Sequence, residues 1–273
     1  MKVVAAVNGM LTAEAAAMYA LAYAKVNGFT LVLFHVRNPS DAMSDVRHSI
    51  ESIRETAEAM EVEVEEAIYD LGGVGSLINY IHANHVDTVF CSTRARRRFL
   101  SASFSDRLVK AAPRVDIAVV RVVHVNTTIY PESVILPIKE TRLSVQKFTF
   151  FSTMLKAYEG EGTILSINTL TRRNLARFTI HRTKQFFKGL NRRLAHYIKL
   201  TDMMGLKVRL KHVLGESERH ELLNYLGSGE YDLMVIGGQR LSFFSKVLGE
   251  RPIEQILRET SVNTIAYYAR EDM

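Results

Sequence analysis

Short, almost continuously apolar runs alternate along the chain with longer segments that repeat apolar residues at helical spacing. Val3–Val7 is apolar throughout, Ala13–Val26 is alanine-rich with a helical period, and Leu31–Val36 is again mostly β-branched and aromatic. Runs of the first kind are typical of buried strands and segments of the second kind of helices.

The same alternation continues to the end of the chain. Further strands are expected at Val62–Ile68, Thr88–Cys91, Ile117–Val123, Val134–Ile138, Thr163–Ile167, Lys207–Val213, Leu233–Ile236 and Thr264–Tyr268, and further helices at Ser44–Met60, Gly75–Ala83, Phe104–Ala111, Leu143–Tyr158, Gln185–Met204, Glu218–Leu226 and Ile253–Glu259. This order predicts an α/β fold built on doubly wound parallel sheets with helices on both faces. Ligands of such sheets bind beyond the carboxyl ends of the strands.

The sequence also repeats itself. "LINYIHANHVDTVF" (Leu77–Phe90) aligns with "LLNYLGSGEYDLMV" (Leu222–Val235) at an offset of 145, whereas "KVVAAVNG" (Lys2–Gly9) aligns with "SVILPIKE" (Ser133–Glu140) at an offset of 131. The difference of 14 predicts an insertion after Asn168. We therefore expect two domains, residues 1–127 and 128–273, the second with a basic insertion at about 169–187.

Composition narrows the class of protein. No apolar run approaches the roughly 18–20 residues that span a bilayer, so we expect a cytoplasmic protein. Cys91 is the only cysteine, which excludes an internal disulfide and a thiol-rich metal site.

Positive charge is concentrated in one segment. Thr169–Thr201 holds six Arg and three Lys with no Asp or Glu, and subtracting these nine charges from the net +6 leaves the rest of the chain at −3. A single basic segment favours contact with one anionic ligand, partner or surface over general affinity for nucleic acid.

Besides the order of strands and helices in each half, two sequence features resemble the universal stress proteins in tandem form, with two UspA-like domains in one chain. The first is an Asp followed by four apolar residues, in "DTVFCS" and "DLMVIGG"; the second is the closing pattern "DRLVKAAPRVDIAVVRV" and "EQILRETSVNTIAYYAR". The resemblance covers essentially the whole chain. It implies two domains of the adenine nucleotide alpha hydrolase-like type that pair through their last strands, Ile117–Val123 and Thr264–Tyr268, as an intramolecular pseudo-dimer. It leaves a further homodimer open and implies a stress-response role.

Nucleotide-binding members of that family carry G-x2-G-x9-G-[ST] after the fourth strand and an Asp at the end of the first. The equivalent positions here are Gly237, Arg240 and Glu250-Arg251 (with Gly249 adjacent) in the second half, Ser92, Ala95 and Ala102-Ser103 in the first, and Asn8 and Lys139 for the Asp. Glycines let the backbone approach phosphate closely. Their loss predicts a degenerate site in which arginines supply the donors instead.

The resemblance places the candidate ligand contacts in both halves, mainly in the second. They are Gly237, Gly238, Arg240, Ser242, Gly249 and Arg251, bordered by Lys139 and Ile167, with Asn8, Val36, Ser92, Arg94 and Ser103 as the first-half equivalents. The implied ligand is ATP, AMP or another anionic small molecule. We expect no metal and no catalytic residues.

Several alternatives stay open. The loop glycines either contact an anion or only permit the turn from strand to helix. The insertion, with Phe186, Leu190, Leu194 and Tyr197 at helical spacing, is a core-packing helix with a flap, a lid, or a surface for acidic lipid or a partner protein.

These alternatives correspond to two functions. The first is a non-enzymatic regulatory protein that binds an anionic small molecule. The second is a docking module that binds no small molecule and uses the basic segment 169–201. Slow ATP hydrolysis is a third hypothesis, and the missing glycines and the lack of a positioned general base argue against it.

Overall fold

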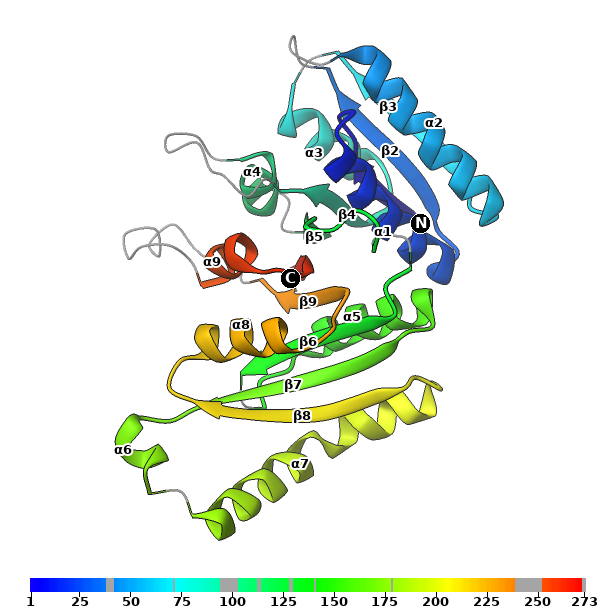
Figure 1. Ribbon diagram of the computed structural model, residues 1–273. Coiled ribbons are helices and arrows are strands. Elements are labelled where there is room, and N and C mark those ends of the chain that lie inside the picture. Colours follow the sequence, from blue (N-terminus) through cyan, green and yellow to red (C-terminus); the bar gives the residue numbers. More distant parts are fainter. Residues whose placement is uncertain are drawn as a thin grey trace.

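The structure is a computed structural model that describes residues 1–37, 42–70, 72–93, 103–111, 114–127, 130–139, 141–177, 179–238 and 252–271 (Figure 1). Its strands form a ten-stranded sheet in the order β3-β2-β1-β4-β5-β10-β9-β6-β7-β8. The strands are β1 (Lys2–Ala6), β2 (Thr30–Val36), β3 (Val64–Tyr69), β4 (Val86–Ser92), β5 (Asp116–Arg121), β6 (Ser133–Lys139), β7 (Glu161–Thr169), β8 (Val208–Gly215), β9 (Leu233–Gly237) and β10 (Asn263–Tyr268).

Helices cover both faces of this sheet. They are α1 (Leu11–Asn27), α2 (Met43–Ala59), α3 (Val74–Ala83), α4 (Phe104–Ala111), α5 (Val145–Tyr158), α6 (Arg172–Leu175), α7 (Ile180–Met203), α8 (Glu218–Ser228) and α9 (Pro252–Glu259). One buried cluster joins the sheet to α1, α2, α5 and α7, and the other joins it to α3, α4, α8 and α9, which lie on opposite sides in Figure 1. The doubly wound α/β fold predicted from the sequence is therefore confirmed.

Burial explains why the central strands read as continuous apolar runs. Every residue of β10 is buried, and every residue of β5 except the last. The terminal strands β3 and β8 are only partly covered and accordingly mix apolar with charged residues. None of the described helices is both long and apolar enough to cross a membrane.

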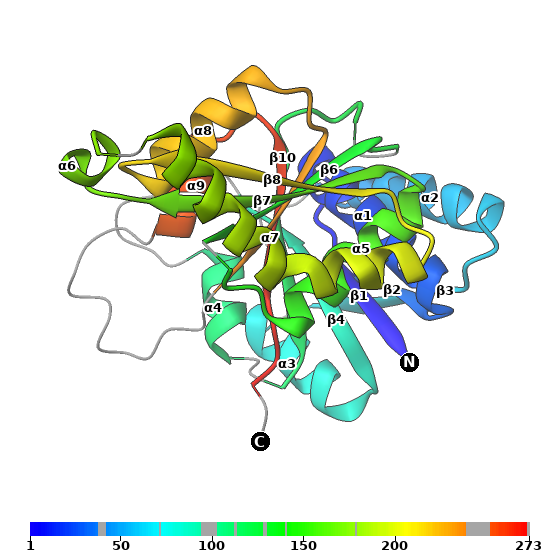
Figure 2. The same ribbon diagram turned by 90° about the horizontal axis from the view of Figure 1, so that it is seen from below.

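The basic insertion forms α6 and the beginning of α7, and α7 starts at Ile180, five residues before the predicted start at Gln185. Thr179 explains the earlier start because its side chain accepts a hydrogen bond from the backbone N–H of Arg182 and so caps the helix. Leu190 and Leu194 are buried, as their spacing predicts. Figure 2, which views the molecule from the β8 end, shows α7 crossing β7 and β8.

The two last strands of the repeats pair with each other, as predicted. β5 and β10 run antiparallel, from Thr264 opposite Arg121 to Tyr268 opposite Ile117, whereas all other neighbouring strands in the sheet are parallel. On either side of this junction the strand order is the same, β3-β2-β1-β4-β5 and β8-β7-β6-β9-β10. The domain limits at residues 127 and 128 stay a prediction.

Side chains at equivalent positions, the first residue of β5 and the first residue of β10, hold the two ends of the β5–β10 pairing. Asp116, the first residue of β5, accepts a hydrogen bond at 2.7 Å from the backbone N–H of Arg270. Asn263, the first residue of β10, accepts one at 2.7 Å from the backbone N–H of Val123. Each strand therefore begins with a side chain that holds the chain just beyond the end of the other strand.

Arg270 adds charge to one of these two ends. Its guanidinium lies 2.7 Å from Asp87 and 3.1 Å from Asp116, and both carboxylates are largely buried. The Tyr267 hydroxyl donates to Asp116 at 2.8 Å, and the Tyr23 hydroxyl donates to Asp87 at 3.1 Å. The hydrogen bond to Asp116, more than any other contact, raises the pKa of Arg270. This network joins the first half of the chain to its carboxyl-terminal end.

We predict that Arg270→Met lowers the free energy of unfolding by about 1–3 kcal/mol, because two buried carboxylates lose their counter-charge. The range lies below that of a fully buried pair because the Arg270 side chain is 39% exposed. Urea denaturation measures the change. Arg209→Met is the matched control: its pair with Glu161 is exposed on both sides, so it should change stability by less than about 1 kcal/mol. Equal losses in the two variants would contradict the prediction.

Candidate functional site

The sheet offers two equivalent places where a ligand could bind. β1 lies between β2 and β4, and β6 lies between β7 and β9. The helix after the inner strand packs on one face, whereas the helix after β4 or β9 packs on the other. The chain therefore leaves the carboxyl ends of β1 and β4, and of β6 and β9, in opposite directions, and ligands of open parallel sheets bind at such switch points.

At the second switch point, Lys139 ends β6 and pairs in register with Ile167 of β7. Gly237 ends β9, and the N–H of the next residue, Gly238, donates to the carbonyl of Tyr267 at 2.7 Å. The structure thus brings the predicted residues Lys139, Ile167, Gly237 and Gly238 to one edge of the sheet. The Lys139 ammonium lies 3.9 Å from the carboxylate of Glu218, at the start of α8.

Lys147 is a second cation at this switch point, and the sequence prediction missed it. It lies in the first turn of α5, where its backbone N–H donates to the side chain of the capping residue Ser144 at 3.2 Å. Its side chain runs over Gly237, since a Cβ at Gly237 would collide with both Cε and Nζ of Lys147. Burial lowers the pKa of Lys147, and the carboxylate of Glu218 opposes that shift.

The two glycines at the end of β9, Gly237 and Gly238, therefore have a structural reason of their own. Gly237 leaves room for Lys147, and Gly238 leaves room for the ring of Tyr268, with which an added Cβ would collide. Neither glycine has a positive φ, so backbone conformation alone does not require glycine at these two positions. Their role here is to let side chains from α5 and β10 close over the end of β9.

At the first switch point, the predicted residues make local contacts. Asn8 accepts a hydrogen bond from the N–H of Met10 at 3.1 Å. The Ser103 hydroxyl accepts from the N–H of Asp106 at 3.1 Å, and Asp106 accepts from the N–H of Ser103 at 3.1 Å. This reciprocal cap puts a carboxylate in the first turn of α4, where an anionic ligand would otherwise be favoured. Val36 and Ser92 end β2 and β4, as the repeat predicts.

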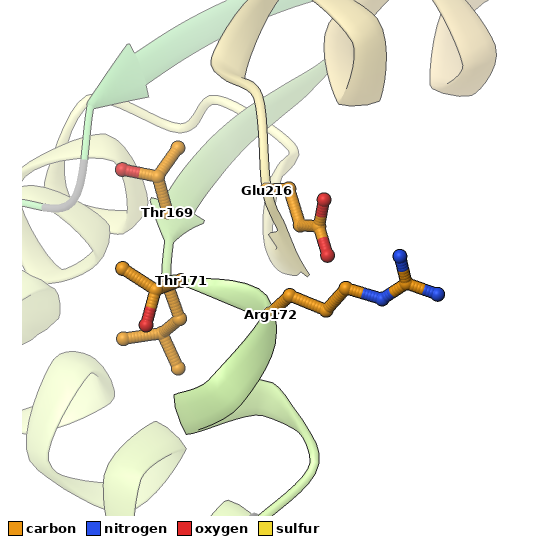
Figure 3. A pocket seen from close by; sticks show the side chains of 5 residues that line it. Thr169, Thr171, Arg172 and Glu216 are labelled. Carbon is orange, nitrogen blue, oxygen red and sulfur yellow. The ribbon is translucent and has the colours of Figure 1, made fainter.

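A pocket of about 370 Å³ lies beyond the carboxyl end of β7 (Figure 3). It is lined by Thr169, Leu170, Thr171, Arg172 and Glu216. Leu170 donates its N–H to the carbonyl of Gly215 at 2.9 Å, which keeps the ends of β7 and β8 together below the pocket. These residues were not predicted individually, although the insertion was expected to begin at this point.

The predicted contacts Arg94, Arg240, Ser242, Gly249 and Arg251 lie outside the described residues. Cys91 is buried, as expected, and burial raises the pKa of its thiol to about 12, so it is a core residue. Within the described part of the chain, no group of three His, Cys, Asp or Glu side chains is arranged to hold a metal ion.

Comparison with solved structures relates this arrangement to known proteins. A universal stress protein from Archaeoglobus fulgidus superposes with a TM-score of 0.63 at 14% identity, over 99% of this chain and 96% of that one. The chain has the universal stress protein fold. A functionally unknown protein from Pseudomonas aeruginosa matches with a TM-score of 0.64 at 11% identity, over 98% of this chain and 92% of that one.

The cytoplasmic domain of a prokaryotic cation chloride cotransporter has the same fold, with a TM-score of 0.58 at 9% identity over 98% of this chain and 95% of that domain. No family model matches the chain, and no curated protein does. At these identities the likeness to stress-protein structures concerns the fold.

Within this stress-protein fold, we predict that Gly238→Ala lowers the free energy of unfolding by about 1–3 kcal/mol, because the new methyl group would force the Tyr268 ring to move. Gly189→Ala, in the middle of α7 with open space at its Cβ, is the control and should stabilise by about 0.5–1 kcal/mol. Thermal and urea unfolding measure both changes. A neutral Gly238→Ala would mean that the Tyr268 ring does not pack against the end of β9.

Proposed function

We propose that the protein binds an anionic, phosphate-bearing small molecule at the second switch point and acts as a non-enzymatic, cytosolic regulatory protein of the stress-response kind. The observation that carries the proposal is the presence of two lysines, Lys139 and Lys147, at the carboxyl edge of β6 and β9. Ligands of open α/β sheets bind at this edge.

Charge at this edge favours an anion. Of the three described side chains placed here, Lys139 and Lys147 are cationic and Glu218 is anionic, so the cations outnumber the carboxylate. A partly buried ammonium interacts more strongly with an anion than an exposed one, because solvent screens it less. The first switch point instead has its own carboxylate, Asp106, in the first turn of α4.

The glycine motif with which nucleotide-binding members of the family contact phosphate is incomplete at this site. Of the motif glycines only the first, Gly237, is in place, and the Lys147 side chain lies against it. A ligand that reaches the end of β9 therefore meets the Lys147 ammonium group. This favours AMP or a comparable anion bound with altered affinity over ATP bound in the usual way.

A second candidate function uses the basic surface, defined as the exposed cationic residues of α6 and α7 and the turn between them. All nine Arg and Lys of Thr169–Thr201 are exposed, and none of them forms an ion pair with a described carboxylate. Through this surface the protein would dock an acidic partner or an anionic membrane. One solved structure with this fold, named above, is the cytoplasmic domain of a cation chloride cotransporter.

We predict opposite effects from the two charges of the Lys139–Glu218 pair on ligand affinity. Lys139→Ala should weaken AMP binding about fivefold, because one charge contact is lost at a half-exposed position. Glu218→Gln should strengthen it about threefold, because a repelling carboxylate is removed while the shape is kept. Isothermal titration with AMP measures both, and native mass spectrometry of the purified protein tests for a retained ligand.

Asn8→Ala, at the equivalent place in the first half, is the control and should leave AMP affinity unchanged. Loss of binding in Asn8→Ala together with unchanged binding in Lys139→Ala would move the site to the first half. A wild-type protein that neither retains an anion nor binds AMP, ATP or phosphate would contradict the small-molecule function.

For the docking function, we predict that the double variant Lys188→Glu, Arg192→Glu abolishes salt-sensitive sedimentation with phosphatidylserine–phosphatidylcholine vesicles. Each exposed basic residue near an anionic surface contributes about 1 kcal/mol. Lys25→Glu, Arg47→Glu changes the net charge equally on exposed positions of α1 and α2 and should sediment like the wild type. If both double variants lost binding equally, net charge and not the basic surface would be responsible.

A further inference from the structure

We propose that Lys147 is a direct ligand of the bound anion and that the anion is a phosphate monoester seated between the first turn of α5 and the end of β9. The inference rests on the proposed function and deepens it, since it names a contact residue that neither the repeat nor the family motif indicates.

Geometry places the Lys147 ammonium at the switch point. Lys147 is the third residue of α5, which follows β6, and its side chain reaches across to Gly237 at the end of β9. It therefore spans the two strands between which the switch point lies, since β6 and β9 are neighbours in the sheet. Any side chain longer than that of glycine at position 237 would displace this ammonium.

In the unliganded protein the Lys147 ammonium lies in an unfavourable electrostatic environment, and a bound anion would stabilise it. The first turn of a helix has a partial positive charge, so a cation there is unfavourable. Partial burial adds a desolvation cost, which lowers the pKa of the amine. Glu218 is the carboxylate that acts on Lys147 over distance, and Glu218 itself forms an ion pair with Lys139 at 3.9 Å. Among the described residues, no carboxylate lies within salt-bridge distance of the Lys147 ammonium.

The charge pattern indicates the class of anion. A phosphate monoester carries close to two negative charges at neutral pH and several acceptor oxygens. Its charge and oxygens match the Lys147 ammonium, the Lys139 ammonium at the end of β6, and the positive end of α5. Inorganic phosphate and a nucleoside monophosphate share this chemistry, and adenosine lacks it.

A purely structural lysine would behave differently. In that case the four methylene groups would pack over Gly237 while the ammonium reached solvent, and methionine would replace them with no effect on anion binding. In the proposed role, Lys147→Met keeps the packing, removes an unfavourable charge and removes the ligand contact. Stability should therefore rise while affinity falls, as is expected where a residue serves binding at the expense of stability.

The experiment compares wild type, Lys147→Met and the control Lys156→Met, which changes an exposed lysine in the last turn of the same helix. Titration calorimetry with AMP, inorganic phosphate and adenosine gives the affinities. We expect Lys147→Met to weaken AMP and phosphate at least tenfold and to leave adenosine unchanged. The thermal midpoint without ligand should rise by about 1–3 °C. Lys156→Met should change none of these.

The pH dependence gives an independent readout. Only the ammonium form binds the anion, so affinity should be highest between the second pKa of the phosphate monoester, about 6, and the pKa of Lys147, and should fall as pH rises through the latter. A ¹³C-lysine titration should place the midpoint of Lys147 below its ordinary 10.5 without ligand and move it upward at saturating phosphate. A midpoint that does not move would overturn the assignment.

The remaining outcomes separate this inference from the proposed function. If wild type binds AMP and Lys147→Met binds it within twofold of wild type, Lys147 is not a ligand, although the proposed function stands. If AMP and adenosine bind equally well and phosphate does not bind, the phosphate assignment is wrong. If wild type binds none of the probes, both proposals fall together.

Discussion

The antiparallel pairing of β5 with β10 is the contact on which the rest of the structure depends. It turns two five-stranded sheets into one, and it buries two strands that would otherwise be edges open to other chains. Asp116 and Asn263 fix its register, because a shift by one residue would break both hydrogen bonds at once and turn buried side chains outward. With this register set, both switch points have fixed places in a single sheet.

The two switch points share one backbone plan but differ in charge. In the first, Ser103 and Asp106 satisfy the start of α4, so the helix has its own anion. In the second, Lys139 and Lys147 place two ammonium groups near one edge. The difference lies in the charged side chains near the strand ends and not in separate cores, since α1 and α5 share one buried cluster in which the rings of Tyr23 and Phe150 stack. One fold can therefore present different charges at two equivalent edges of its sheet.

Most of the fold could be predicted from the sequence because it depends on local patterns. Apolar runs such as Leu31–Val36 and the repeat around Asp87 and Asp232 suffice to predict the alternation of strands and helices in each half. The pairing of the last strands was implied by the resemblance to the universal stress proteins. The short helix α6 was missed because four residues are too few to show a helical period.

The candidate site was predicted in part. Lys139, Ile167 and Gly237 follow from the family motif, since motif positions lie at strand ends. Lys147 does not, because its role depends on the length and direction of a side chain that crosses from α5 to β9. The spacing of residues along the sequence does not indicate that a side chain of α5 reaches the end of β9. The lysine also looks like an ordinary helix residue between the apolar positions that predict α5.

The unlike ends of the central junction have an evolutionary consequence. In an assembly of two identical subunits, any substitution occurs on both sides of the axis, so the residue that begins the last strand must serve two equal environments. A single chain that supplies both strands does not have that constraint. One end has an aspartate that binds Arg270, and the other has an asparagine that hydrogen-bonds the backbone around His124. Selection can therefore act on each end separately, and the same freedom extends to the two switch points that the junction holds in place.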